Sequence, residues 1–117
     1  MIKDRLLSLP NEIEITRTEV LNKQQGLEEI RLKIKNWELM ETIEIANEVD
    51  DKGKVVYSND TKRQAELQYR KSESAIYNNY FKISKELEKE VAALEIKLDK
   101  MFNEQGNLRA VCRLGDE

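Results

Sequence analysis

The side chains able to do chemistry in this chain are carboxylates, basic groups, tyrosines and one cysteine, because its 117 residues contain no histidine. This absence removes the commonest general base and the pairing of a serine or cysteine nucleophile with histidine. The single cysteine, Cys112, lies between Arg109 and Arg113, but no histidine or second cysteine accompanies it. We therefore expect no catalytic residue, no metal site and no cofactor.

The carboxylates form short clusters, at residues 28–29, 50–51 and 86–90. An acid–base pair needs two carboxyl groups in different environments, one of them desolvated, and nothing in the sequence marks any of these as buried. The turn that starts at Asp50 lacks the alternating oxygen ligands and the closing glutamate of an EF-hand. The clusters are therefore interpreted as solvated charges on helices and in a turn.

Two basic sets are the candidate binding residues. The first, the tip set, combines cations with an aromatic side chain around the strongest turn signal: Lys52, Lys54, Tyr57, Lys62 and Arg63. Such a combination binds phosphate, nucleic acid or an acidic protein surface, although an ordinary solvated turn is the alternative. The second set is Arg109 and Arg113, whose spacing of four puts both guanidinium groups on one helix face, where they would suit a phosphate-bearing ligand.

The amino-acid composition of the chain predicts that both basic sets lie on or between helices. Charged residues make up 37% of the chain and hydrophobic residues 39%, with four glycines and one proline. That is little turn material for a sandwich, a barrel or an α/β sheet, which need many turns. We therefore expect an all-α fold, a long antiparallel two-helix hairpin of coiled-coil type, formed by residues 1–117 as one domain.

Apolar residues recur every seven positions, which is typical of a coiled-coil seam. This heptad repeat includes positions 13, 20, 27 and 34, and a second one includes positions 80, 87, 94 and 101. The residues expected to form this inner seam and the core of a dimer are Ile13, Val20, Leu27, Ile30, Ile34, Trp37, Tyr80, Leu87, Leu94 and Met101.

Local signals predict where the helices begin and end. Pro10 suits a first helical turn, Asn59 suits an N-cap, and Gly106 suits a C-terminal stop. The expected segments are a first helix over about 11–47, a turn over 48–58, a second helix over about 60–103 and a short segment over 107–114. An alternative for the turn pairs residues 43–49 with 54–58 as a short β-hairpin.

A two-helix hairpin buries little apolar surface against the entropy of ordering its residues. We therefore expect a homodimer, most simply a four-helix arrangement. The alternative is a monomeric three-helix bundle with a break near Trp37 or over 72–74.

Charge and hydropathy bear on location and partners. The net charge of −3 disfavours nucleic-acid binding by the whole surface, since such binders usually carry a basic surplus. The first residues lack the apolar core of a signal peptide, and no apolar run approaches the ~20 residues that span a bilayer. We expect a cytoplasmic protein without a membrane partner.

Residues 46–66 contain a turn of the type Asp-x-x-Gly-Lys, then Tyr57-Ser58-Asn59 and a charged helix, and the chain closes near Arg113-Leu114. In these features it resembles small, uncharacterised helical-hairpin proteins encoded by phages and prophages of Firmicutes. The resemblance implies an accessory or counter-defence role in the host cytoplasm and brings no catalytic residue with it.

The expected function is accordingly non-enzymatic: a phage accessory or counter-defence protein that binds and modulates a host protein. One alternative is a nucleic-acid-binding factor in phage recombination or replication that uses the tip set. The other is a nucleotide-binding sponge at an oligomer interface that uses Arg109 and Arg113.

Overall fold

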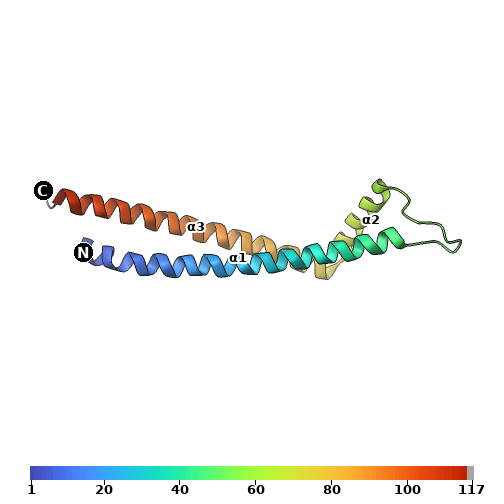
Figure 1. Ribbon diagram of the computed structural model, residues 1–117, viewed down its shortest axis with the longest axis horizontal. Helices are drawn as coiled ribbons and strands as arrows, with labels where there is room; N and C mark the ends of the chain where they lie inside the picture. Colours follow the sequence, from blue (N-terminus) through green and yellow to red (C-terminus); the bar gives the residue numbers. More distant parts are fainter. Residues whose placement is uncertain (116–117) are drawn as a thin grey trace. The chain divides into compact units, whose positions relative to one another are not determined.

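A computed structural model describes residues 1–115, and all of its regular elements are helices (Figure 1). They are α1 (Ile2–Asn47), α2 (Asp60–Glu73) and α3 (Ala75–Gly115). Across residues 1–115 no strand forms, and the single isolated bridge is an antiparallel one between Val49 and Val55. The expectation of an all-α fold is confirmed, with three helices in place of the two expected.

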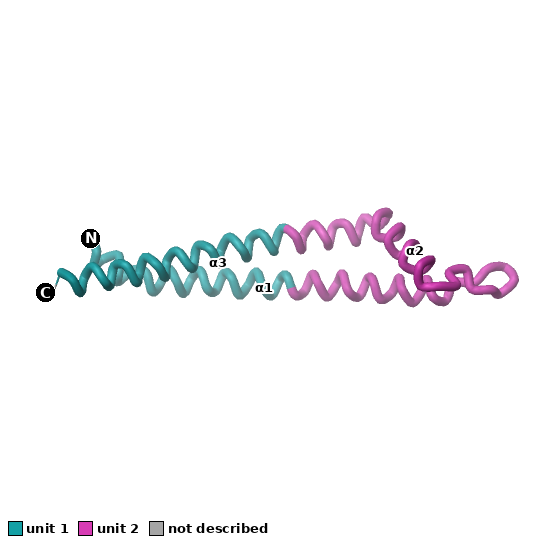
Figure 2. Tube along the Cα trace, turned by 90° about the horizontal axis from the view of Figure 1, so that it is seen from above, with its two compact units in different colours: residues 1–27, 86–117 teal, residues 28–85 magenta. Residues whose placement is uncertain are grey.

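Contacts divide the chain into two compact units (Figure 2). Unit 1 contains residues 1–27 together with the chain from residue 86 onward, and unit 2 contains residues 28–85. In each unit a stretch of α1 packs against a stretch of α3 that runs in the opposite direction. Unit 2 also holds α2 and the connection over residues 48–59, which is called the tip below.

The core of unit 1 lies between α1 and α3. Its centre is a buried cluster of Leu9, Ile13 and Met101, with Leu98 and Leu108 packed against it. Val20, Leu27 and Val91 are buried as well, and the ammonium of Lys23 lies 3.0 Å from the carboxylate of Glu90. The seven-residue spacing in α1 therefore faces α3 within the same chain.

In unit 2 the contact between α1 and α3 is more aromatic. The ring centroids of Trp37 and Tyr77 are 4.8 Å apart, and those of Tyr77 and Phe81 are 6.3 Å apart. Across both units, the ten inner-seam residues divide evenly. Ile13, Val20, Leu27, Ile30 and Met101 are buried, and Ile34, Trp37, Tyr80, Leu87 and Leu94 are half-buried.

The first correction to the sequence prediction concerns the start of the first helix, which is Ile2 rather than residue 11. Pro10 lies inside α1 even though it removes one backbone donor. Contacts with α3 hold the preceding turns in place, because Leu9 is fully buried and the guanidinium of Arg5 binds the carboxylate of Glu104 at 2.6 and 3.0 Å. Tertiary packing thus outweighs the local signal that a helix starts at Pro10.

The second correction is that the predicted second helix is broken at Ser74, which has an extended backbone (φ −84°, ψ 114°). Ser74 caps both neighbours, because its N–H donates to the Arg70 carbonyl and its hydroxyl accepts from the Tyr77 N–H, each at 3.0 Å. The side-chain amide of Asn78 also donates to the Ser74 carbonyl at 2.9 Å. The break lies in the stretch where the three-helix alternative placed one.

The third correction is that α3 continues through Gly106 to Gly115, so that 107–114 is not a separate segment. Leu108 packs against the core of unit 1, which favours continuing the helix over ending it at a glycine. The β-hairpin alternative is also wrong over residues 43–47, because these residues belong to α1.

Among the helices formed by residues 1–115, none is long and apolar enough to cross a bilayer.

Candidate functional site

The tip is an ordered loop closed by backbone hydrogen bonds. The Val56 N–H donates to the Glu48 carbonyl at 3.0 Å, and the Asp50 N–H donates to the Lys54 carbonyl at 2.8 Å. Inside both closures, the Gly53 N–H donates to the Asp50 carbonyl at 2.9 Å. The chain therefore reverses direction within a few residues.

A carboxylate and a glycine make this reversal possible. One oxygen of Asp50 accepts from the N–H groups of Lys52 and Lys54, both at 2.9 Å, so it satisfies donors that the turn would otherwise leave open. Gly53 has φ +78°, in the left-handed region that glycine adopts without steric cost. The tip is consequently held in one conformation by its own short-range contacts.

Three valines project from this ordered tip with large exposed surfaces. Val49 is 54% exposed, Val55 46% and Val56 40%. They lie on both closing arms of the reversal, and Val49 and Val55 form the bridge pair. Backbone hydrogen bonds fix the conformation of the loop. The loop therefore does not need these valines to form an apolar core, and their surface is left exposed.

The structure divides the tip set into exposed and structural members. Lys52, Lys54 and Lys62 are exposed, whereas Tyr57 is half-buried. The guanidinium of Arg63 donates to the Tyr57 carbonyl at 3.0 Å and so connects the tip to α2.

Charge around the tip is balanced rather than basic. Residues 48–66 carry five acidic and four basic side chains: Glu48, Asp50, Asp51, Asp60 and Glu66 against Lys52, Lys54, Lys62 and Arg63. The exposed lysines therefore alternate with carboxylates, and the tip has no basic surplus of the kind that phosphate backbones attract.

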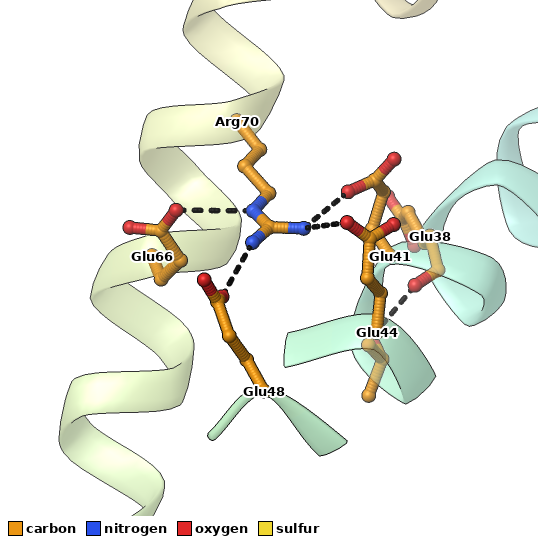
Figure 3. Close-up of polar contacts among 7 residues, drawn as sticks. Glu38, Glu41, Glu44, Glu48, Glu66 and Arg70 are labelled. Atoms are coloured by element: carbon orange, nitrogen blue, oxygen red, sulfur yellow. Dashed lines mark hydrogen bonds and ion pairs between the residues drawn. The ribbon is translucent and has the colours of Figure 1, made fainter. Parts of the chain in front are cut away.

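Where α2 meets the end of α1, a single guanidinium is surrounded by carboxylates (Figure 3). We call this group the Arg70 cluster; its members are Arg70, Glu41, Glu44, Glu48 and Glu66. The Arg70 nitrogens lie 2.9 Å from Glu41, 3.3 Å from Glu44, 3.1 Å from Glu48 and 3.0 Å from Glu66. Only 18% of the Arg70 side chain is exposed.

The Arg70 cluster attaches α2 and the adjoining tip to α1. The hydrogen bonds that Arg70 donates to Glu41 and Glu66 hold the pKa of Arg70 above its ordinary value, so the guanidinium stays charged. Burial raises the pKa of the Tyr57 phenol, and the carboxylates of Glu48 and Glu66 raise it further. Next to the cluster, the ammonium of Lys71 lies 3.0 Å from Glu38. These ionic contacts join the two helices beside a small hollow that Ile45 of α1 and half-buried Leu67 of α2 line together.

The sequence analysis did not predict that Arg70 joins two helices. The available signal was the row of glutamates at 38, 41, 44 and 48, whose spacing of three and four places their carboxylates on one side of α1. Such a row favours a basic partner from another element, because like charges at this spacing repel one another. The partner itself was not predictable, because it depends on how α2 folds back.

Arg109 and Arg113 are both exposed in the last turns of α3. An open concavity of about 550 Å³ lies near them, between the two ends of the described chain. It is lined by Met1, Ile2, Lys3, Val111, Cys112 and Gly115, so neither arginine is among its lining residues. The structure thus does not combine the two guanidinium groups with an apolar pocket.

Within residues 1–115, no group of three or more cysteine, aspartate and glutamate side chains is arranged to hold a metal ion. The carboxylates that do converge, at Arg70, already share one cation.

Comparison with known proteins finds no match: no protein family, no curated protein and no solved structure is similar to this chain.

Proposed function

We propose that this chain is a non-enzymatic interaction protein that acts as a dimer and binds a second protein through its tip. The observation that carries the proposal is the exposure of Val49, Val55 and Val56 on a loop whose conformation is fixed by its own hydrogen bonds. The proposal assigns no chemical step to any residue.

Preorganisation is the physical reason why such a loop suits binding. A flexible loop loses conformational entropy when a partner orders it, and this loss subtracts from the affinity. The tip is already ordered by Asp50 and Gly53, so most of that cost falls on folding rather than on binding. Apolar groups at the centre of a contact supply most of its binding energy, and the valines provide such groups.

The polar rim of the tip narrows the chemistry of the partner. Lys52 and Lys54 are exposed beside the valines, while Asp51 contributes a negative charge in the same turn. A partner that offers an apolar depression flanked by both acidic and basic groups matches this rim, and rim charges of this kind govern specificity and association rate. A uniformly negative surface such as a nucleic-acid backbone matches it less well.

The resemblance to phage-encoded hairpin proteins supports a protein of the bacterial host as the partner. Binding would then modulate that protein by occupying its surface, which is the counter-defence or accessory role expected from the sequence. The location of this encounter would be the host cytoplasm.

The test compares two exposed valine sites on the full-length chain. The tip variant is Val55→Asp/Val56→Asp, and the control is Val111→Asp, which alters a valine that is 49% exposed on α3. The wild-type protein is immobilised and exposed to host-cell lysate, and the partner that it captures is purified. The affinity of this partner for the wild type and for each variant is then measured by calorimetry. We expect the tip variant to weaken binding at least about tenfold, since a charge replaces apolar contact, and the control to bind like the wild type.

Equal binding by the tip variant and the wild type would contradict the proposal. A mobility shift of DNA at ~50 mM salt that disappears in Lys52→Glu/Lys54→Glu would instead support the nucleic-acid alternative.

A further inference from the structure

α1 presents a second apolar row within unit 2, on the side away from its inner seam. Leu32 is 57% exposed, Leu39 56% and Ile43 49%, although all three are large aliphatic side chains in the middle of a helix. With Asn36 they lie within about 60° of one another around the helix axis at 100° per residue. We call these four residues the outer seam.

The outer seam lies opposite the residues that α1 uses inside unit 2. Ile30 and Ile45 are buried, and Trp37 stacks on Tyr77 from the same inner side. The inner seam is thus occupied by the chain itself, and it does not offer an apolar surface for a dimer. An apolar row this regular on the outside of a helix indicates a further helical partner.

Spacing and residue types identify the partner as a second copy of this chain. Leu32 and Leu39 are seven apart and occupy d positions of a heptad, and Asn36 and Ile43 are seven apart and occupy a positions. Isoleucine at a with leucine at d favours two parallel strands, and a single asparagine at a fixes the register of such a pair. We propose that two chains associate through the outer seam, parallel and in register, with Asn36 facing Asn36 of the other copy.

One flanking charge pair agrees with this arrangement, and Glu29, which occupies the preceding a position, ends the apolar seam on that side. Glu28 occupies a g position and Lys33 the following e position, and these two positions approach each other between the chains of a parallel coiled coil. In the dimer Glu28 of one copy would meet Lys33 of the other, whose ammonium lies 5.8 Å from the ring centroid of Tyr80 in its own chain, and symmetry would repeat the pair. In an antiparallel pair Asn36 would instead face an apolar residue, Leu39, and its amide would lose its polar partner.

This inference rests on the dimer in the proposed function and specifies its surface, independently of what the tip binds. The experiment measures the mass of the full-length protein by sedimentation over a range of concentrations. We expect a species of twice the 13.7 kDa chain mass. Leu39→Asp should raise the dimer dissociation constant at least about a hundredfold, because each chain would bury a charge in the seam.

The control for this variant is Ile96→Asp, which changes a similarly exposed residue (57%) on α3 and should leave the mass unchanged. A second measurement does not depend on the fold of Leu39→Asp. In the Cys112→Ser background, Asn36→Cys should form a disulfide between chains under mild oxidation, whereas Asn103→Cys on α3 should not.

Each outcome separates the inference from the wider proposal. A dimer that survives Leu39→Asp, or that does not cross-link through position 36, overturns the outer seam and leaves dimerisation in place. A species of 13.7 kDa at every concentration overturns both the outer seam and the dimer, while partner binding by the tip is still decided by the capture experiment.

Discussion

Unit 1 and unit 2 differ in what holds their helices together. In unit 1 the contact is an apolar cluster of Leu9, Ile13 and Met101, with the pair Arg5–Glu104 at its edge. In unit 2 a whole helix, α2, has no buried residue and is joined to α1 by Arg70 and Lys71. Unit 1 thus relies on apolar area, whereas in unit 2 the charged contacts of α2 add to a small apolar contact, in which half-buried Leu67 lines one hollow together with the buried Ile45 of α1.

The difference has consequences for stability. Apolar burial contributes about 25 cal/mol per Å² and is little affected by salt, whereas exposed ion pairs contribute roughly 0–1 kcal/mol and are screened. The Arg70 cluster is stronger than an ordinary surface pair, since the guanidinium is largely shielded and bonded on all three nitrogens. Even so, the α2 region that adjoins the tip should open locally before the core of unit 1 does.

The largest effect should come from the core of unit 1. Leu9 is 0% exposed, so Leu9→Ala leaves a cavity and should lower the free energy of unfolding by roughly 2–5 kcal/mol. The control is Leu7→Ala, two residues away and 80% exposed, which should change it by less than about 0.5 kcal/mol. Urea denaturation followed by circular dichroism measures both. Similar losses in the two variants would show that this stretch of α1 is not packed as described.

The next largest effect should follow removal of the Arg70 charge. Arg70→Met leaves the carboxylates of Glu41, Glu48 and Glu66 facing one another, and it should cost roughly 1.5–3 kcal/mol, the range for hydrogen bonds to charged groups. Hydrogen exchange should accelerate in residues 60–73 and stay unchanged in residues 2–27. Lys62→Met, which removes an exposed cation from α2, is the control. Uniform acceleration over the whole chain would mean that the two units do not differ in this way.

A pair of glycine substitutions should act with opposite signs. Gly53→Ala forces a side chain into the left-handed region, which costs roughly 1–2 kcal/mol for an L-residue, here at φ +78°. Gly106→Ala lies inside α3, where the new Cβ meets nothing within 4 Å beyond the neighbouring backbone of its own helix, and it should stabilise the helix by roughly 0.5–1 kcal/mol. Urea midpoints give both signs. Stabilisation by Gly53→Ala would contradict the turn geometry of the tip.

The smallest effect should be the acid sensitivity of the pair Arg5–Glu104. The guanidinium of Arg5 holds the pKa of Glu104 below its ordinary value, so the pair stabilises the fold above the ordinary carboxyl pKa. That contribution is lost as the pH falls through the lowered pKa. Wild type and Glu104→Gln should therefore differ in urea midpoint at neutral pH and converge in acid. A difference that persists in acid would assign the effect to packing instead of charge.

The heptad pattern made the helical class predictable, and it also identified apolar residues that the fold buries or half-buries. Leu27 and Met101 are examples, since their spacing alone places them in rows that one partner helix can cover. The turn chemistry was equally local: Asp50 and Gly53 do in the structure what their residue types favour. Such features depend on neighbours within a few residues, and a sequence displays those neighbours directly.

The exact course of the helices was less predictable. Pro10 favours a helix start and Gly106 a helix end, yet both lie inside helices because Leu9 and Leu108 pack against a distant segment. Ser74 breaks a helix although no proline or glycine is nearby. Its hydroxyl accepts a hydrogen bond from the Tyr77 N–H and so caps the first turn of α3. Propensities amount to about 1 kcal/mol per residue, and tertiary contacts exceed that easily.

By itself, the sequence determined the all-α class, the seven-residue rows and the turn that forms the tip, because periodicity and turn residues act over short distances. Only the tertiary structure decided that Arg70 gathers four carboxylates, that three valines of the tip are exposed, and that Leu32, Leu39 and Ile43 lie outside the packed interior. These outcomes depend on which side of each helix another helix covers. That choice is made by contacts between residues up to 99 positions apart in the chain, such as Arg5 and Glu104, which no local pattern records.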